Sequence, residues 1–498
     1  MSIFSTFSIG KQGLLSHQRA IQVTSRNIAN VNTPGYSRQR AIFDPIQGQF
    51  GPDGFPLGGG VNVRDVQRIV DLNIEQQLQR EQISFAFDET VEKGLARIES
   101  IFDELGEAGL SKTVDRFFSS LNDLANNPTS TAVRDSVVGS AQTLLSQITG
   151  ADARLNQVAL DANSQIARDV EEINSLARSI ATTNNSIARL EIGSGTASEQ
   201  RDVRAQLLQE LGKKIDFTYF EREDGTIAVQ ASGFPLVDGD TVARLEVDTR
   251  QPTPLADPTY FNVFYNINGQ VSGPITPRIT GGSLGGNLSM RDERVPQYRE
   301  LLDRFTFTLA NSVNTQHLAG AGIDDGNARN FFIDRLSGGP NPPGDPLTAV
   351  SGAARLITVN PDIVANSRHL ATGAPSAGPG PAATGDNTNA LALAGLATTQ
   401  VPFFLAGDPP GPATGATQTF GAFLSSASGA LGADLQNVRL DLQKGDLVIA
   451  ELEDRRGSIS GVSIDEEVSD LVRFQRGYEA SARVISTVDE LLQILLSI

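Results

Sequence analysis

Residues 464–498 form one continuous helical pattern at the very end of the chain. Apolar side chains recur there at alternating steps of three and four residues, which places them on one face of a helix. This stripe consists of Ile464, Leu471, Phe474, Tyr478, Ile485, Val488, Leu492 and Leu495. Glu467 and Ser481 are its polar exceptions, and no proline interrupts it. A terminal helix of this kind needs a partner for its apolar face.

The first thirty residues offer that partner. Phe7, Leu14, Ile21 and Ile28 fall seven residues apart and predict a second amphipathic helix over residues 2–31. Pro34-Gly35 marks its end, because proline disfavours helical geometry in the residue before it. One interpretation is that the two ends pair as a two-helix unit into which the rest of the chain is inserted. The alternative is that each terminal helix packs on its own neighbouring domain.

A second long helical pattern lies in the middle of the chain. From Ala141 to Ile187 the apolar residues alternate steps of four and three, with a stutter between Ile166 and Val170. A helix over residues 131–190 would be roughly 90 Å long, at ~1.5 Å per residue. We predict a coiled-coil arm whose partner is the helix predicted over residues 65–105 or a later one. Further helices are predicted over residues 112–124, 199–211, 291–318, 387–396 and 420–456.

The period of the apolar residues changes from helical to two at Ile215. Asp224-Gly225 and Asn268-Gly269 follow as hairpin turn signals, so residues 215–282 are predicted as a β-rich insert. Shorter extended pieces are predicted at Arg38–Phe43 and Val61–Val66. The predicted fold class is mainly α with a β insert. We divide it into a terminal core domain of residues 1–35 and 460–498, a long-helix rod domain of residues 36–214 and 283–459, and the insert domain of residues 215–282.

Composition limits the function classes. The formal net charge of −18 argues against a nucleic-acid partner, because Lys and Arg are too few to neutralise phosphates. No apolar run is long enough for a membrane span, and no basic leader precedes an apolar block at the N-terminus, so we expect no cleavable secretory signal. The sequence has no cysteine, which excludes disulfides and thiolate metal sites.

One motif could carry chemistry. Residues 281–285 match the Gly-x-Ser-x-Gly nucleophile elbow, which requires a preceding strand, a following helix and a downstream acid and histidine. The surroundings lack the βαβ alternation of a hydrolase sheet, so a glycine-rich hinge is favoured over a serine hydrolase that uses Ser283. His17, His317 and His369 stand singly, and we interpret His17 as a polar contact between helices. We predict no catalytic residue, no metal ligand and no cofactor.

Two terminal stretches resemble the axial proteins of the bacterial flagellum. Residues 23–43 are similar to that family's N-terminal signature, which centres on Asn27-Ile28-Ala29-Asn30 and continues through Pro34-Gly35-Tyr36. Residues 461–467 and 473–491 are similar to its C-terminal segment. Residues 33–39 resemble the hook-associated members of the family more than the hook and rod subunits. The middle of the chain matches by the order of its elements more than by its residues.

The resemblance implies a structural subunit, not an enzyme, that forms the junction between flagellar hook and filament. It implies that the terminal helices pair as an α-helical coiled coil inside a hollow tube, with the rod domain around them and the small β domain pointing outward. Expected partners are copies of the chain in a ring, the hook subunit, a second junction protein on the filament side and a cytoplasmic export chaperone at the C-terminal helix. The chain would leave the cell unfolded through the flagellar export apparatus. A second outer domain, present in longer relatives, is missing or reduced to residues 335–415.

These expectations leave alternatives open. The chain could be a hook or rod subunit of the same family, a secreted hydrolase that uses Ser283, or a coiled-coil adaptor that stays in the cytoplasm. For a junction subunit, we expect the two terminal stripes to form the assembly interface, with sister copies burying the apolar surface that one partner helix leaves uncovered.

Overall fold

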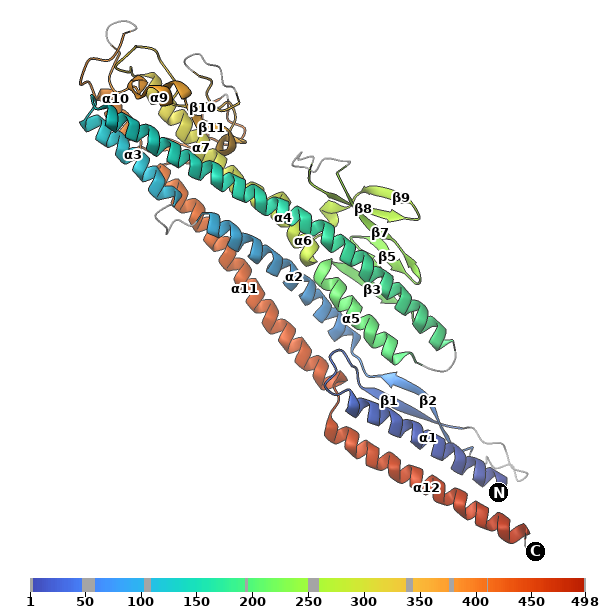
Figure 1. Cartoon of the computed structure of the whole chain (residues 1–498). Helices are drawn as coiled ribbons and strands as arrows, with labels where there is room; N and C mark the ends of the chain where they lie inside the picture. The colour runs from blue at the N-terminus through green and yellow to red at the C-terminus, as the bar shows by residue number, and fades with distance from the viewer. Residues whose placement is uncertain are drawn as a thin grey trace.

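The two ends of the chain meet as a pair of helices in the computed structural model. Helices α1 (Ile3–Ala29) and α12 (Ile464–Leu496) run antiparallel, and both termini lie at the same end of the molecule (Figure 1). The structure describes residues 3–46, 59–102, 109–192, 196–249, 259–336, 344–375, 380–409 and 411–496. Gly10 lies against Ile485, Gly13 against Ser481 and Gly477 against His17, which fixes the register of the pair. The predicted pairing of the two ends is therefore confirmed.

A two-stranded ribbon packs on this helix pair. Strands β1 (Gln39–Pro45) and β2 (Val61–Arg68) pair antiparallel, with a bulge between Ile42 and Phe43. Both predicted extended pieces are present. The predicted start of the next helix at residue 65 is wrong, because residues 65–68 complete β2, and α2 (Leu72–Ile101) begins only after Asp71 caps it. The three-residue step from Val63 to Val66 fits a helix and not a regular strand, which explains the error; in the structure the bulge lies between them, where Ile42 pairs with Asp65 and Phe43 with Val63.

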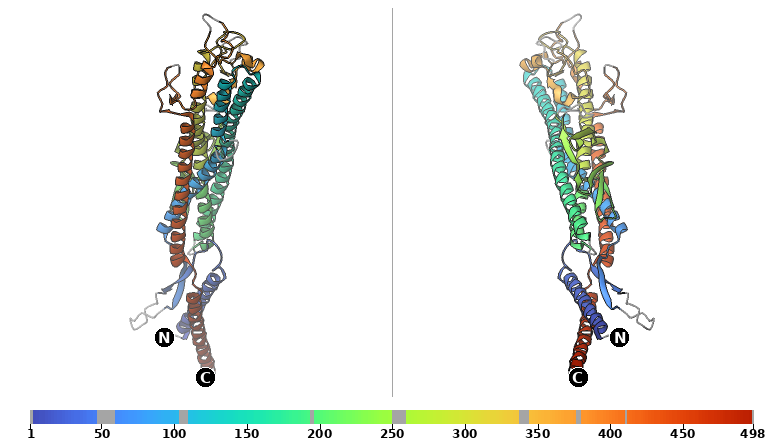
Figure 2. Two further views of the ribbon diagram at one scale, coloured as in Figure 1. Left: turned by 90° about the vertical axis from the view of Figure 1, so that its left-hand side faces the viewer. Right: turned by 90° about the vertical axis from the view of Figure 1, so that its right-hand side faces the viewer.

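Long helices form a narrow rod above the helix pair. They are α2, α3 (Leu110–Asn126), α4 (Thr131–Glu191), α7 (Val295–Leu318) and α11 (Phe420–Ser460). They run along the rod, with α11 beside α2 and α4 beside α3 (Figure 2). Leu121, Leu155, Phe305 and Phe420 belong to the buried core that they share. Helix α11 continues through Gly457 to Ser460, beyond its predicted end at residue 456.

Helix α4 has the predicted length, and its neighbours include the predicted partners, α2 and later helices. It contacts α2, α3, α5 (Ser198–Lys214), α7 and the strands of the insert, so it is the spine of the rod and not one arm of a two-stranded coiled coil. The two polar residues in its apolar period show why. Asp152 pairs with Arg299 at 3.0 Å, and the Asn184 Nδ2 atom donates to the carbonyl oxygens of Ile227 and Gly239, both at 2.9 Å.

The β insert forms two small antiparallel sheets on one side of α4. The first has the order β3 (Phe217–Glu221), β4 (Ile227–Ala231), β5 (Phe234–Asp238), β6 (Thr241–Val242), and the second β7 (Arg244–Asp248), β8 (Asn262–Ile267), β9 (Gln270–Pro274). Both predicted turns are present, and Asn268 and Gly269 adopt φ of 52° and 83°. Val229 and Leu245 share a core with Ile173 and Ile180 of α4, so the insert does not close a core of its own.

Short elements complete the chain. The 3₁₀ segment Thr276–Arg278, α6 (Gly282–Ser289) and the π turn Met290–Arg294 lead from the insert into α7. At the distal end lie α8 (Ala353–Leu356), α9 (Pro361–Ala365), the 3₁₀ segment Ser367–His369 and α10 (Thr388–Gly395). Strands β10 (Phe332–Asp334) and β11 (Ile357–Val359) pair there, as do β12 (Val401–Pro402) and β13 (Thr417–Gln418).

The stretch of residues 335–415 is anchored to the rod where the structure describes it. The guanidinium of Arg134, fully buried at the start of α4, donates to the Leu370 carbonyl oxygen and to the Thr372 hydroxyl, both at 2.8 Å. Residues 337–343, 376–379 and 410 of this stretch lie outside the described residues. Among the described residues, no helix is long and apolar enough to cross a membrane.

Candidate assembly site: the helix pair and its joint

The signature residue Asn27 is the centre of a buried network that ties both ends of the chain together. Its side chain is 1% exposed. Its Nδ2 atom donates to the Gln39 carbonyl oxygen at 2.8 Å and to Glu467 Oε2 at 3.0 Å, and its Oδ1 atom accepts from the Gln39 N–H at 3.1 Å and from the Tyr36 hydroxyl at 2.8 Å. The amide thus pairs with the main chain of β1 as a neighbouring strand would, and all of its hydrogen-bonding capacity is used.

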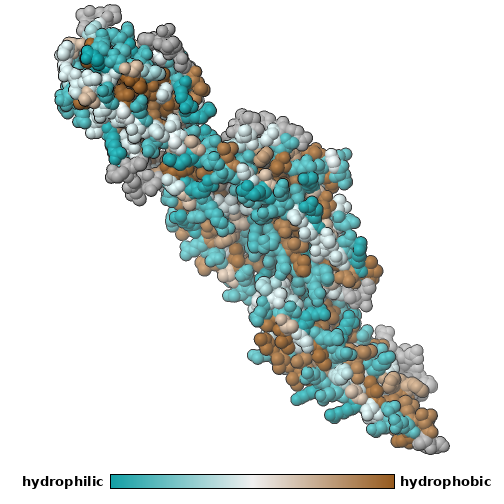
Figure 3. All heavy atoms as spheres, in the orientation of Figure 1, coloured by the Kyte–Doolittle hydropathy of each residue, from teal (hydrophilic) through white to brown (hydrophobic). Residues whose placement is uncertain are grey.

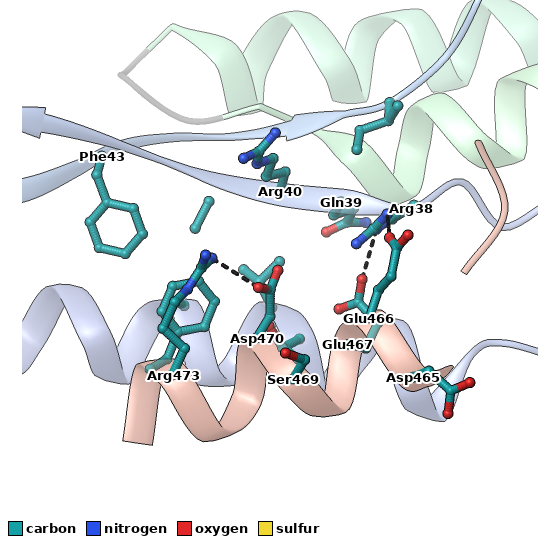
Figure 4. Close-up of a pocket in the computed structure, with 16 residues that line it drawn as sticks. Arg38, Gln39, Arg40, Phe43, Asp465, Glu466, Glu467, Ser469, Asp470 and Arg473 are labelled. Atoms are coloured by element: carbon teal, nitrogen blue, oxygen red, sulfur yellow. Dashed lines mark hydrogen bonds and ion pairs between the residues drawn. The ribbon is translucent and has the colours of Figure 1, made fainter. Parts of the chain in front are cut away.

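Arg38 completes the network from the other side (Figure 4). Its Nε atom donates to Glu467 Oε1 at 2.7 Å and its Nη1 atom to Glu466 Oε2 at 2.6 Å. Burial alone would lower the pKa of Arg38, but the hydrogen bonds to Glu466 and Glu467 outweigh it and raise the pKa. The Arg38 N–H donates to the Ser460 carbonyl oxygen at 2.9 Å. Arg38, the residue directly before β1, therefore holds the end of α11 and the start of α12. We call this cluster, Asn27, Tyr36, Arg38, Gln39, Glu466 and Glu467, the joint.

The rest of the signature shapes the loop between α1 and β1. The Asn30 Nδ2 atom donates to the Arg26 carbonyl oxygen at 3.0 Å and so caps the end of α1. Gly35 adopts a φ of +77°, which glycine favours, and the Pro34 carbonyl oxygen accepts from Gln206 of α5 at 2.7 Å. Burial raises the pKa of Tyr36 to about 12. The loop therefore fastens the helix pair to the rod.

Small residues, not the predicted large ones, form the seam of α1. The buried residues of this helix are Gly10, Gly13, Ser16, Ala20, Val23, Thr24 and Asn27. A Cβ atom on Gly477 would lie 2.5 Å from His17 Cε1, so close approach of the helices requires glycine there. The interpretation of His17 as a polar contact is wrong, because its ring packs between Phe43 and Phe474 and no described residue bonds its Nδ1 atom.

The predicted stripes lie beside this seam or outside it. On α1, Phe7 is exposed, whereas Leu14, Ile21 and Ile28 are half-buried. On α12, Val488 is buried, and the half-buried residues are Leu471, Phe474, Tyr478, Ile485 and Leu492. Ile464 is exposed, and the side chain of Leu495 lies outside the described part of the chain. The polar exceptions Glu467 and Ser481 both lie on the seam, against Asn27 and Gly13. The breaks in the apolar period were the signal that could have located the seam.

A band of apolar side chains stays uncovered on the helix pair. Phe4 is 73% exposed and Phe7 40% exposed. Other exposed members are Leu15, Ile464, Val468, Val472, Val484 and Leu491. Hydrophobic residues gather on this end of the molecule in the space-filling view (Figure 3). Exposed apolar side chains that gather at one end of a molecule are typical of an interaction site.

The alternative site at Ser283 has a different geometry from a nucleophile elbow. The Ser283 hydroxyl donates to Asp169 Oδ2 at 3.0 Å, and no histidine bonds it among the described residues. The buried Asp169 carboxylate also accepts from Asn287 and Lys214, so it fastens α6 and the end of α5 to α4. His317 is engaged elsewhere: its Nδ1 atom donates to the Arg329 carbonyl oxygen at 2.7 Å, and its Nε2 atom accepts from the Ala371 N–H. The contacts of Ser283 and Asp169 are therefore those of a structural cluster that holds helices together.

Three family models match this chain, and their positions follow its architecture. Residues 9–36 match the model of the flagella basal body rod protein, and residues 457–498 match the C-terminal model of the flagellar basal body rod FlgEFG proteins. Together with the antiparallel terminal helices and the joint, these matches place the chain in the class of flagellar axial proteins. Residues 95–332 match the model described as the flagellar hook-associated protein FlgK helical domain.

The curated relatives identify the family within that class. The chain is 26% identical to flagellar hook-associated protein 1 of Salmonella typhimurium, over 98% of both chains. It is 24% identical to the protein of the same name from Bacillus subtilis, over 99% of this chain and 97% of that one. A solved structure of the flagellar hook junction protein FlgK from Burkholderia pseudomallei has a similar fold, with a TM-score of 0.65 at 15% identity, and covers 77% of this chain. The chain belongs to the flagellar hook-associated protein 1 family.

Proposed function

We propose that this protein is the structural subunit that forms the junction between the flagellar hook and the filament. The observation that carries the proposal is the apolar band on the helix pair, which one chain alone leaves in water. Burial of a large apolar side chain is worth about 1.5–3 kcal/mol, so neighbouring copies that cover the band would stabilise a ring. The relatives named above are hook-associated proteins, and the solved neighbour is a hook junction protein.

The domain roles follow the sequence prediction. Residues 1–35 and 460–498 act as the inner core domain and pair as an α-helical coiled coil in the assembly. Residues 36–214 and 283–459 act as the rod domain, and residues 215–282 form the domain that points outward. The position of both sheets on one side of α4 supports an outward face (Figure 1). The ribbon β1–β2 is the exception to the predicted division: its residues lie in the range given to the rod domain, but it packs on α1, so we assign it to the inner domain.

The partners follow from the position in the flagellum. Copies of the chain form a ring, the hook subunit contacts one side, and a second junction protein contacts the other. Export proceeds through the flagellar export apparatus in unfolded form, with a cytoplasmic chaperone on the C-terminal helix before secretion. The exposed apolar residues of α12, such as Val472 and Leu491, support a chaperone, because they need cover until assembly.

Deletion of residues 477–498 tests the proposal. We expect the rod to stay folded, because its core contains no residue of α12, while assembly on hooks and swimming are lost. Normal assembly of the truncated chain would contradict the proposal.

A point variant tests the apolar band itself. Val472→Glu places a charge on the exposed face of α12 and should abolish assembly without loss of helix content. Val364→Glu is the matched control, because Val364 is equally exposed but lies at the distal end on α9. Circular dichroism measures the fold, and the amount of the chain in sheared, purified hooks measures assembly. Equal assembly of both variants would refute a role for the band.

A further inference from the structure

Strand β1 has one edge paired with β2 and one open edge. The N–H and carbonyl groups of Gln39 face away from β2, because the side chain of Asn27 bonds both of them. Ile46, just beyond the strand, faces β2, since its N–H donates to the carbonyl oxygen of the residue before β2 at 2.9 Å. The bulge adds its extra residue to β2, so the alternation along β1 is not interrupted. The main-chain groups of Ala41 and Phe43 therefore lie on the open edge, as those of Gln39 do.

The open edge is short, because both of its ends are closed. The Asn27 amide occupies it at Gln39. Pro45 closes the other end, since proline has no N–H to donate and is tolerated where a strand faces away from its ladder. Outside the ladder of β1 and β2, the main-chain groups of Ala41 and Phe43 form no hydrogen bond with any described residue. Two neighbouring donor–acceptor pairs are thus open to an incoming chain.

A groove lies beside this edge, between β1 and the helices α1 and α12 (Figure 4). Its volume is about 570 Å³, and Ala41 and Phe43 both line it. The Gln39 side chain lines it too. This side chain is 2% exposed, and neither its Nε2 nor its Oε1 atom has a partner among the described residues. Buried amides are normally paired, because an unpaired one costs about 1–3 kcal/mol. The groove therefore offers the hydrogen-bonding groups that an extended chain needs.

The charged side chains of the groove largely balance one another. Four carboxylates and three guanidinium groups line it: Asp465, Glu466, Glu467, Asp470, Arg38, Arg40 and Arg473. Arg38 binds two of these carboxylates, and Arg473 binds Asp470 at 2.9 Å. The two others, Arg40 and Asp465, carry one charge of each sign. The groove therefore suits an uncharged segment that is held by main-chain hydrogen bonds.

The groove adjoins the apolar band on α12. Asp465 and Ser469 line the groove, and the exposed Val468 and Val472 of the band lie on the same two turns of the helix. A neighbouring copy that covers the band therefore reaches the groove as well. Such a contact joins two different surfaces, and it closes into a ring when the copies are related by rotation about one axis.

We propose that an extended segment of the neighbouring copy in the ring adds to the open edge of β1 as a further strand. This inference rests on the proposed function, because it needs copies side by side in a ring. The main-chain groups of Ala41 and Phe43 bond about three residues of the incoming segment, since bonded residues alternate along a strand. The Gln39 amide bonds its main chain at one end. Its side chains pack on Phe43 and Phe474, whose ring centroids are 5.7 Å apart.

Hydrogen exchange at single amides tests the added strand in the natural chain. Flagella are labelled intact, dissociated under quench conditions and measured by mass spectrometry with electron-transfer fragmentation. Compared with the isolated chain, we expect exchange at Ala41 and Phe43 to slow by about tenfold or more in hook–filament junctions. The amides of Arg40 and Ile42, which face β2, are the internal control and should be protected in both states. Equally fast exchange at Ala41 and Phe43 in both states would overturn the added strand.

A proline variant blocks the edge without breaking the ladder. Ala41→Pro removes one outward N–H, just as the natural Pro45 does without, and Ala41→Val is the matched control that keeps the N–H. When each variant is expressed together with the natural chain, we expect Ala41→Pro to be several-fold under-represented in purified junctions and Ala41→Val to be incorporated normally. The Tm of each isolated variant checks its fold. Equal incorporation of both would contradict the proposal, and if Ala41→Pro lowers the Tm, the exchange measurement decides.

Photo-cross-linking identifies the chain that docks. Ser469 is exposed on the rim of the groove, so Ser469→p-benzoyl-phenylalanine places the photoreactive group beside it. We expect adducts to a second copy of this chain in photolysed junctions, and a several-fold lower yield per assembled chain when Ala41→Pro is added. Adducts to a different flagellar protein, or a yield that Ala41→Pro does not change, would overturn the inference and leave the proposed function intact. Absence of the natural chain from purified flagella would overturn both.

Discussion

Replacement of Asn27 by aspartate should open the helix pair without disturbing the rod. The change keeps the size of the side chain but removes both N–H donors. The carbonyl oxygen of Gln39 and the Oε2 atom of Glu467 then lose their partner, at sites where the donor now stands 2.8 and 3.0 Å away. The new carboxylate also faces Glu467 directly, so attraction turns into repulsion.

The magnitude follows from these contacts. A buried acceptor without a partner costs about 1–3 kcal/mol. Two like charges at about 4 Å repel by about 4 kcal/mol at an effective dielectric constant of 20, and the adjacent Arg38 offsets part of this. The Gln39 N–H and the Tyr36 hydroxyl can still donate to the new carboxylate. We therefore expect a loss of about 3–5 kcal/mol in the free energy that keeps α1 and α12 paired.

Hydrogen exchange of the α12 amides measures this loss in the intact chain. A loss of 3 kcal/mol corresponds to about two orders of magnitude in the opening equilibrium. Asn32→Asp is the matched control, because Asn32 is exposed two residues beyond Asn30 and should show no change. The effect of Asn27→Asp should shrink as the pH is lowered, because protonation of the introduced carboxyl removes the repulsion. Unchanged α12 exchange in Asn27→Asp would refute the role assigned to the joint.

Three further predictions concern other parts of the molecule. Burial lowers the pKa of His317 to about 4, so the unfolded chain takes up the proton first, and stability should fall by up to about 3 kcal/mol as pH drops from about 6.5 to 4. The variant H317Q should lose this dependence in denaturant titrations at the two pH values. Gly477→Val should lower the hydrogen-exchange protection of the α12 amides, because the new Cβ atom would meet His17. Gly150→Ala should raise the Tm of the rod, because nothing lies within 4 Å of the new Cβ atom and the helix no longer contains a glycine that costs about 1 kcal/mol relative to alanine. Asp169→Leu should destabilise the rod by about 1–3 kcal/mol, because the buried Asn287 amide loses its acceptor, although Lys214 keeps its ion pair with Glu172 at 2.6 Å. Ser283→Ala should leave swimming speed unchanged.

The sequence predicted the elements that repeat over many residues. The length of α4 followed from its period between Ala141 and Ile187, and the pairing of the chain ends followed from the stripe on α12. Both signals extend over several helical turns, so errors at single positions average out. The turns at Asp224-Gly225 and Asn268-Gly269 were equally clear, because few residues tolerate a positive φ.

The joint could not be derived from such periods. Its members come from α1, the following loop, β1 and α12, and only the fold brings Asn27 next to Glu467, 440 positions away. Each residue alone is an ordinary polar side chain in the sequence. The resemblance to axial proteins singled out Asn27 as part of a signature, but the hydrogen bonds that require an asparagine appear only in the structure. The seam of α1 was missed for a related reason, because glycine and serine carry no weight in an apolar period.

In the helix pair, small and polar residues form the contact between α1 and α12, whereas large apolar residues lie outside it. This arrangement suits a subunit that assembles with other chains. If large apolar residues filled the seam, the pair would bury them by itself and leave little to gain from neighbours. Here glycine, serine and alanine let the helices approach closely, and Phe4, Phe7 and Leu15 stay outside. Small residues alone would specify the register of the two helices weakly. The buried hydrogen bond between Asn27 and Glu467 forms in one register only, just as a buried polar residue fixes the register of a coiled coil. Polar contacts thus fix how one chain folds on itself, and the apolar surface is kept for the contacts between chains.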